Sequence, residues 1–135
     1  MTIAGSPASA AHAALLGMKK AKELIDLRKH QGEHPRIGAT DVVPFVPISG
    51  ISMQQCAELA WIVGDLAWSE LGIPVYFYEA AAKRPNRMNL ADIRKGEFEG
   101  LSVEALSNPD RMPDVGGPGL HESAGASVVG ARQFL

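Results

Sequence analysis

Residues 52–78, SMQQCAELAWIVGDLAWSELGIPVYFY, predict a capped helix that leads directly into a buried strand. Ser52, followed three residues later by Gln55, has the spacing of a capping box, in which each side chain binds a backbone N–H at the start of a helix. Apolar residues then recur every three or four positions until Gly72, which closes the helix. The β-branched and aromatic run at 73–78 indicates a strand. A helix joined to a strand in this way makes an α+β fold the starting hypothesis.

The flanking sequence predicts further helices and strands. Gly5-Ser6-Pro7 combines a turn, a helix cap and a proline suited to the first helical position, so a long helix should begin there. Pro44 and Pro47 confine a β-branched segment to an edge or a bulge of a sheet. The remaining expected elements are strands at 39–48 and 126–135 and short helices at 90–95 and 102–107. This order favours a two-layer, ferredoxin-like sandwich with an antiparallel or mixed sheet and two main helices on one face.

The composition indicates one globular domain, because 135 residues suffice to bury a core. The 13 Lys and Arg nearly balance the 15 Asp and Glu, for a formal net charge of -2. The broad positive surface of a nucleic-acid binder is therefore missing. Cys56, the single cysteine, lies in an apolar pattern and should be a packed, reduced thiol. With no secretory leader and no run of eighteen apolar residues, we expect a cytoplasmic protein that makes no membrane contact.

The run RKHQGEHPRIG at 28–38 concentrates ionisable side chains just before a sharp turn. His30 and His34 could be exposed residues at a helix end, where imidazolium complements the carbonyl dipoles. They could also bind a metal, although Gly32 interrupts the regular helix that two ligands four residues apart would need. A third hypothesis makes His34 a general acid and base on a fixed turn, with Arg36 as a local charge. The residues alone leave these three hypotheses open.

A second candidate site is the glycine-rich segment PDVGGPGLHESAG at 113–125. Glycine backbone can approach a flat ligand closely and present its N–H groups to it. A plain turn is the simpler explanation, and it also stays open. The sequence contains neither a Gly-x-Gly-x-x-Gly turn nor a Gly-Lys-Ser/Thr phosphate loop, so nucleotide binding through either motif is excluded.

Five segments together resemble the N-terminal part of the formiminotransferase family, which comprises folate-dependent enzymes of histidine degradation. They lie at 25–42, which includes the His-Gln-Gly-Glu-His-Pro-Arg-Ile-Gly run, and at 73–81, 93–99, 117–126 and 130–135. The resemblance covers nearly the whole chain. It implies that residues 1–135 form an incomplete N-terminal subdomain, with strand-helix-strand material upstream and a second subdomain downstream.

The resemblance also implies roles for individual residues. His34 occupies the position of the catalytic histidine in this family. His30 and Arg36 are candidates for orienting the substrate, Arg36 through a substrate carboxylate. The segment that would contact folate comprises Gly116, Gly117, Pro118, Gly119, Leu120, His121, Glu122, Ser123, Ala124 and Gly125.

The expected reaction transfers a formimino group between N-formimino-L-glutamate and N5 of tetrahydrofolate, which serves as a co-substrate without a metal. A homodimer is expected for the complete protein. The alternative hypothesis is a non-catalytic folate-binding or assembly module of the same fold, because half of a two-part cleft can bind a ligand without turning it over.

Overall fold

Three parallel strands form the centre of the molecule in a computed structural model that describes residues 1–29 and 35–134. The strands β1 (Val42–Phe45), β3 (Ser127–Ala131) and β2 (Val75–Glu79) lie side by side in that order. Val42 is opposite Val128 in one pair, and Val75 is opposite Ser127 in the other. The strand that comes last in the sequence is therefore the central one.

Helices occupy every connection between consecutive strands. After α1 (Pro7–Leu24) and β1, the chain forms α2 (Met53–Leu71) on its way to β2. Two shorter helices, α3 (Leu90–Arg94) and α4 (Glu97–Glu104), precede β3, with single 3-10 turns at Pro85–Arg87 and Pro109–Arg111. A helical connection returns the chain to the end of the sheet from which it left, so the next strand runs parallel to the previous one.

The chain is thus a small α+β structure, but the expected antiparallel or mixed sheet is wrong. Every strand pair in the described sheet is parallel, and the ferredoxin-like arrangement is not confirmed. A sequence signal for this outcome exists, because strands of parallel sheets are covered on both faces and have continuous apolar runs. All five residues of β3 are buried, as are the first four of β2.

The local helix signals are confirmed. Ser6 caps α1, whose first residue is a proline, and the Ser52–Gln55 capping box opens α2 with both of its reciprocal hydrogen bonds. Gly72 ends α2 with a left-handed φ of 66°. The short helix expected at 102–107 instead begins at Glu97, directly after Gly96 with a φ of 85°.

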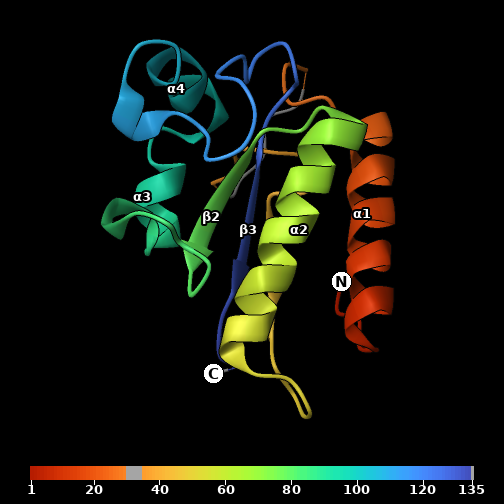
Figure 1. Ribbon diagram of the computed structural model, residues 1–135. Coiled ribbons are helices and arrows are strands. Elements are labelled where there is room, and N and C mark those ends of the chain that lie inside the picture. Colours follow the sequence, from red (N-terminus) through yellow and green to blue (C-terminus); the bar gives the residue numbers. More distant parts are fainter. Residues whose placement is uncertain (30–34, 135) are drawn as a thin grey trace.

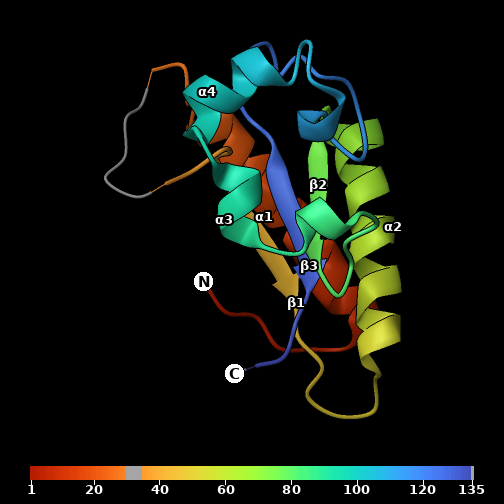
Figure 2. The same ribbon diagram turned by 90° about the vertical axis from the view of Figure 1, so that its left-hand side faces the viewer.

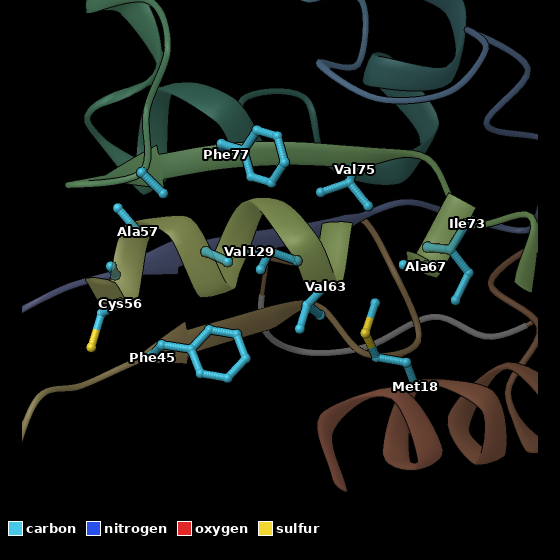
Figure 3. Close-up of a cluster of buried hydrophobic side chains, with 13 residues drawn as sticks. Met18, Phe45, Cys56, Ala57, Val63, Ala67, Ile73, Val75, Phe77 and Val129 are labelled. Atoms are coloured by element: carbon cyan, nitrogen blue, oxygen red, sulfur yellow. The ribbon is translucent and has the colours of Figure 1, made fainter. Parts of the chain in front are cut away.

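Apolar side chains on the two faces of the sheet form two separate cores. The two long helices cover one face, as expected: α2 lies directly on the sheet, with α1 beside it (Figure 1). Cys56 is buried in this core, and Figure 3 shows Phe45, Phe77 and Val129 from the three strands beside α2. Full burial of a side chain such as Phe77 stabilises the fold by about 1.5–3 kcal/mol.

The shorter helices cover the opposite face of the sheet, which faces the viewer in Figure 2. Tyr76 and Tyr78 project from β2 into this second core, where they meet Ile93 of α3 and Leu101 of α4. Burial raises the pKa of both tyrosines above its ordinary value. The two-sided covering explains why Tyr76, Phe77 and Tyr78 can be consecutive aromatic residues, since both faces of β2 are buried.

Both outer strands have protected edges. Val75 of β2 exchanges backbone hydrogen bonds with Val115, and Asp114 accepts from the N–H of Phe77 at 2.8 Å. On the other side, β1 has four residues and includes Pro44, which has no N–H to donate, as the sequence predicted for an edge strand. None of the helices in the described part of the chain combines the length and hydropathy of a membrane-crossing segment.

Candidate functional site

An open cleft of about 750 Å³ lies between α4 and two loops. One wall consists of residues 27–29, which directly precede the histidine run, here residues 30–34, and a second is formed by α4, with Phe98 and Glu99. His121 of the glycine-rich segment lies at the third side. Its imidazole ring is nearly parallel to the ring of Phe98, at an interplanar angle of 18° and a centroid distance of 6.2 Å. The cleft therefore joins both segments that the sequence singled out.

Residues 35–38, which follow the histidine run, attach by backbone hydrogen bonds to two different elements. The N–H of Phe98 in α4 donates to the carbonyl oxygen of Arg36 at 2.9 Å. The N–H of Ala126 donates to the carbonyl oxygen of Ile37 at 2.8 Å. The turn is consequently held between α4 and the end of the glycine-rich segment.

Asp41 closes this turn from within. Its Oδ1 atom accepts from the N–H of Ile37 at 2.7 Å, and its Oδ2 atom forms an ion pair with Arg94 of α3. A hydrogen bond from a backbone N–H to an Asp side chain is a common way to fix a turn. Asp41 thereby connects the turn to the helices above the sheet.

The glycine-rich segment contributes unequally to the cleft, because its residues face different surroundings. His121 is exposed and lines the cleft, whereas the side chain of Leu120 is fully buried in the second core. Gly116 packs against the ring of Trp68 with a φ of 92°. The hydroxyl of Ser123 lies 2.8 Å from the carbonyl oxygen of Gly125, so it stabilises the segment itself.

The other residues of the predicted folate-contacting segment lie against Trp68 or against the segment itself. Gly117 lies near Trp68, and the carboxylate of Glu122 folds back toward Gly119. Ala124 has a positive φ of 58°, and Pro118 accepts a hydrogen bond from the N–H of Leu120 at 2.9 Å. These residues shape the backbone path that presents His121 to the cleft.

Arg36 binds acidic residues of its own chain. Its guanidinium donates two hydrogen bonds to Glu99, at 2.8 and 3.0 Å, and a third to Glu97 at 3.3 Å. The Arg36 guanidinium lowers the pKa of Glu99 below its usual value, and the hydrogen bonds to Glu99 raise the pKa of Arg36. The expected pairing with a substrate carboxylate would have to compete with these contacts.

His30 and His34 lie outside the described residues, so the hypotheses of catalytic, metal-binding and exposed histidines stay predictions for both. Across residues 1–29 and 35–134, no three His, Cys, Asp or Glu side chains converge in a way that could hold a metal ion. The cleft lining combines apolar side chains such as Leu27 and Val103 with charged ones, among them Arg28, Lys29 and Glu99.

Cationic groups are present at the wall formed by residues 27–29. Arg28 pairs with Asp26 through hydrogen bonds of 2.8 and 2.9 Å, which lower the pKa of Asp26 to about 2. Asp26 thus stays ionised at neutral pH. Lys29 lines the same wall and is exposed.

Sequence reasoning missed the contribution of α4, whose residues Phe98, Glu99, Ser102 and Val103 form a wall of the cleft. Segment 93–99 belongs to the resemblance, but nothing in its local pattern shows that it faces a turn some 63 residues earlier. The available signal was the pair of acids that flank Phe98, because a carboxylate is a frequent bidentate partner of an arginine.

Comparison with known proteins gives a consistent result. Residues 1–132 match the family described as "Formiminotransferase domain, N-terminal subdomain". A glutamate formimidoyltransferase of Streptococcus pyogenes serotype M1 is 50% identical over 134 residues, which are 99% of this chain and 44% of the relative. One from Thermoplasma acidophilum is 46% identical over 136 residues, 100% of this chain and 45% of the relative.

A formimidoyltransferase-cyclodeaminase of Gallus gallus is 46% identical over 134 residues, 99% of this chain and 25% of the relative. The chain spans less than half the length of each of these three relatives.

Proposed function

Because the chain belongs to the formiminotransferase family as its N-terminal subdomain, we propose that a protein carrying it transfers formimino groups. The proposed reaction moves this group between N-formimino-L-glutamate and N5 of tetrahydrofolate. The observation that carries the proposal is the cleft, where residues 27–29, α4 and His121 meet. The segments on either side of the histidine run both reach it, Lys29 directly and Arg36 through Glu99. The single buried Cys56 supports a reducing compartment, so the proposal includes a cytoplasmic location.

The cleft suits the reduced folate in size and chemistry. Its volume of about 750 Å³ falls within the roughly 300–1,000 Å³ typical of small-molecule sites. The rings of Phe98 and His121 offer flat surfaces for an aromatic part of the ligand. Lys29 supplies a positive charge for a carboxylate of the ligand. Since Leu120 is enclosed by the core, we assign the glycine-rich segment a role through its backbone and through His121.

His34 is the proposed proton carrier of the reaction. When N5 adds to the formimino carbon, that carbon becomes tetrahedral and bears three nitrogens. The attacking nitrogen becomes cationic and must lose a proton, while the departing glutamate nitrogen must gain one before its bond to carbon breaks. One imidazole with a pKa near neutrality can accept the first proton and return it to the second nitrogen.

The variant His34→Ala tests this assignment in a full-length enzyme that carries the segment. We expect kcat to fall by roughly 10²–10⁴-fold, the usual contribution of positioned acid–base catalysis, with little change in the Kd for tetrahydrofolate. His12→Ala is the matched control, because His12 is exposed on α1 and should leave both quantities unchanged. Turnover of His34→Ala at the level of the control would remove His34 from the mechanism.

A non-catalytic folate-binding module is the second candidate, because the chain spans less than half of its relatives and its cleft is open. Calorimetry of the isolated chain with tetrahydrofolate, run beside a turnover assay, separates the two functions. Binding with no turnover in the isolated chain and in the full-length protein alike would favour the module.

A further inference from the structure

Arg36 and Glu99 attach residues 35–38 to the α4 wall of the cleft. The guanidinium meets both carboxylate oxygens of Glu99, at 2.8 and 3.0 Å, in the bidentate geometry that combines strength with a fixed orientation. One residue along α4, the N–H of Phe98 binds the backbone of Arg36. Side chain and main chain of one turn residue are therefore tied to the same helix.

The start of α4 is shaped so that both of its acids reach the guanidinium. Glu97 has a φ of 56°, a left-handed conformation that non-glycine residues rarely adopt, and it follows Gly96 with a φ of 85°. Such backbone conformations persist where the surrounding contacts determine them. The ion pairs of Arg36 with Glu97 and Glu99 are contacts of that kind.

The attachment persists at neutral pH. The Arg36 side chain is largely withdrawn from solvent, with 13% of it exposed. Its hydrogen bonds lower the pKa of Glu99, so this carboxylate stays ionised until the pH falls well into the acidic range. A carboxylate from substrate would have to displace Glu99 to gain the same donors.

We propose that Arg36 is a positioning residue, which acts with Glu99 to hold residues 35–38, the segment that directly follows His34 in the sequence, against the α4 wall of the cleft. This inference rests on the proposed function, because it assigns His34 the proton transfer that Arg36 supports. A positioning role predicts that loss of the pair misaligns the proton carrier and slows the chemical step, while substrate affinity is retained.

Steady-state kinetics of Arg36→Met, Glu99→Gln and the double variant in a full-length enzyme test the proposal. We expect each single variant to lower kcat by roughly 10- to 100-fold, with an unchanged KM for N-formimino-L-glutamate. The double variant should be no slower than Arg36→Met alone, because both substitutions break one interaction.

Glu104→Gln is the matched control. Glu104 is the last residue of α4 and does not line the cleft. It pairs with Arg111 at 2.9 Å and similar exposure, 16% for Arg111 and 55% for Glu104. This variant should keep the wild-type kcat. If Arg36 instead binds the substrate carboxylate, Arg36→Met will raise KM steeply and Glu99→Gln will lower it, which would overturn the positioning role.

A further comparison separates the two proposals. If Glu99→Gln turns over like Glu104→Gln while His34→Ala is inactive, the positioning role fails and the proposed function stands. If His34→Ala turns over normally, the proposed mechanism itself fails.

Discussion

Two glycines, Gly38 and Gly125, allow the backbone of residues 37–38 to approach the backbone of residues 125–126 closely. A Cβ atom on Gly38 would lie 1.7 Å from the carbonyl oxygen of Ala126, and one on Gly125 would lie 2.7 Å from the carbonyl oxygen of Ile37. Gly125 also has a φ of 123°, which L-residues rarely adopt. The hydrogen bond between Ala126 and Ile37 depends on this close approach.

The substitution Gly38→Ala should lower the free energy of unfolding by about 3 kcal/mol or more. The new methyl group would clash with backbone atoms of Ala126, which cannot move aside as a side chain can. Gly17→Ala is the control, since Gly17 lies inside α1 with no atom within 4 Å of its added Cβ. The control should raise stability by about 0.5–1 kcal/mol, the gain from helix propensity. Urea denaturation of both variants measures the difference, and equal stabilities would contradict the steric argument.

The helix α2 begins at a complete capping box. The Ser52 hydroxyl accepts from the N–H of Gln55 at 3.1 Å, and the Gln55 side chain accepts from the N–H of Ser52 at 2.8 Å. These bonds satisfy two backbone donors that a helix start leaves unpaired. Since α2 packs on all three strands, its first turn supports the larger of the two cores.

Ser52→Ala removes one of these bonds and should destabilise the protein by about 1 kcal/mol. Ser69→Ala is the control, because it removes a hydroxyl at an exposed position in the last turn of α2 and leaves the cap intact. This variant should be neutral or slightly stabilising. Thermal unfolding followed by circular dichroism gives both values. A loss in Ser52→Ala no greater than in Ser69→Ala would show that the cap contributes nothing.

The helix limits were predictable because their signals are local. Ser6, Ser52 and Gly72 each act within one helix turn, and the structure confirms all three. The direction of the strands was predicted wrongly, because short apolar strands do not by themselves distinguish parallel from antiparallel neighbours. A strand with one solvated face has alternating polar and apolar residues, and β2 and β3 have no such alternation. This pattern was the sequence signal against a ferredoxin-like sheet.

In the molecule as a whole, a buried ionic network joins β2 to the loop that covers its edge. Arg87 lies 3.4 Å from Asp114, and the exposed fractions of the two side chains are 3% and 5%. Arg87 also donates to the carbonyl oxygens of Asp110 and Met112 and lies over the ring of Tyr76. Burial lowers the pKa of Arg87, and the nearby Asp114 carboxylate acts in the opposite direction by stabilising the charged guanidinium.

Asp114→Ala should destabilise the protein by about 3–5 kcal/mol, because it leaves a buried guanidinium without its counter-ion. Adding Arg87→Met should restore part of that loss, since the charge that needs compensation is then gone. A double-mutant cycle in urea measures the coupling. Glu104→Gln, which breaks an exposed pair, should cost no more than about 1 kcal/mol, and strictly additive losses at positions 87 and 114 would refute the coupling.

The site could be predicted from the sequence only in part. The sequence identified 28–38 and 113–125 as candidate segments, and the structure brings their neighbours together through Ile37 and Ala126. It could not show that Arg36 is neutralised by Glu99, because that contact joins residues 63 positions apart. Contacts of this length depend on the final packing of α4 and leave no local pattern.

The central place of β3 has a consequence for synthesis on the ribosome. Both strand pairs of the described sheet involve residues 127–131, so β1 and β2 lack a neighbouring strand until β3 has been translated. A nascent chain paused before position 127 therefore exposes the apolar face of α2 and two strands without their neighbour in the sheet, a state that is prone to aggregation.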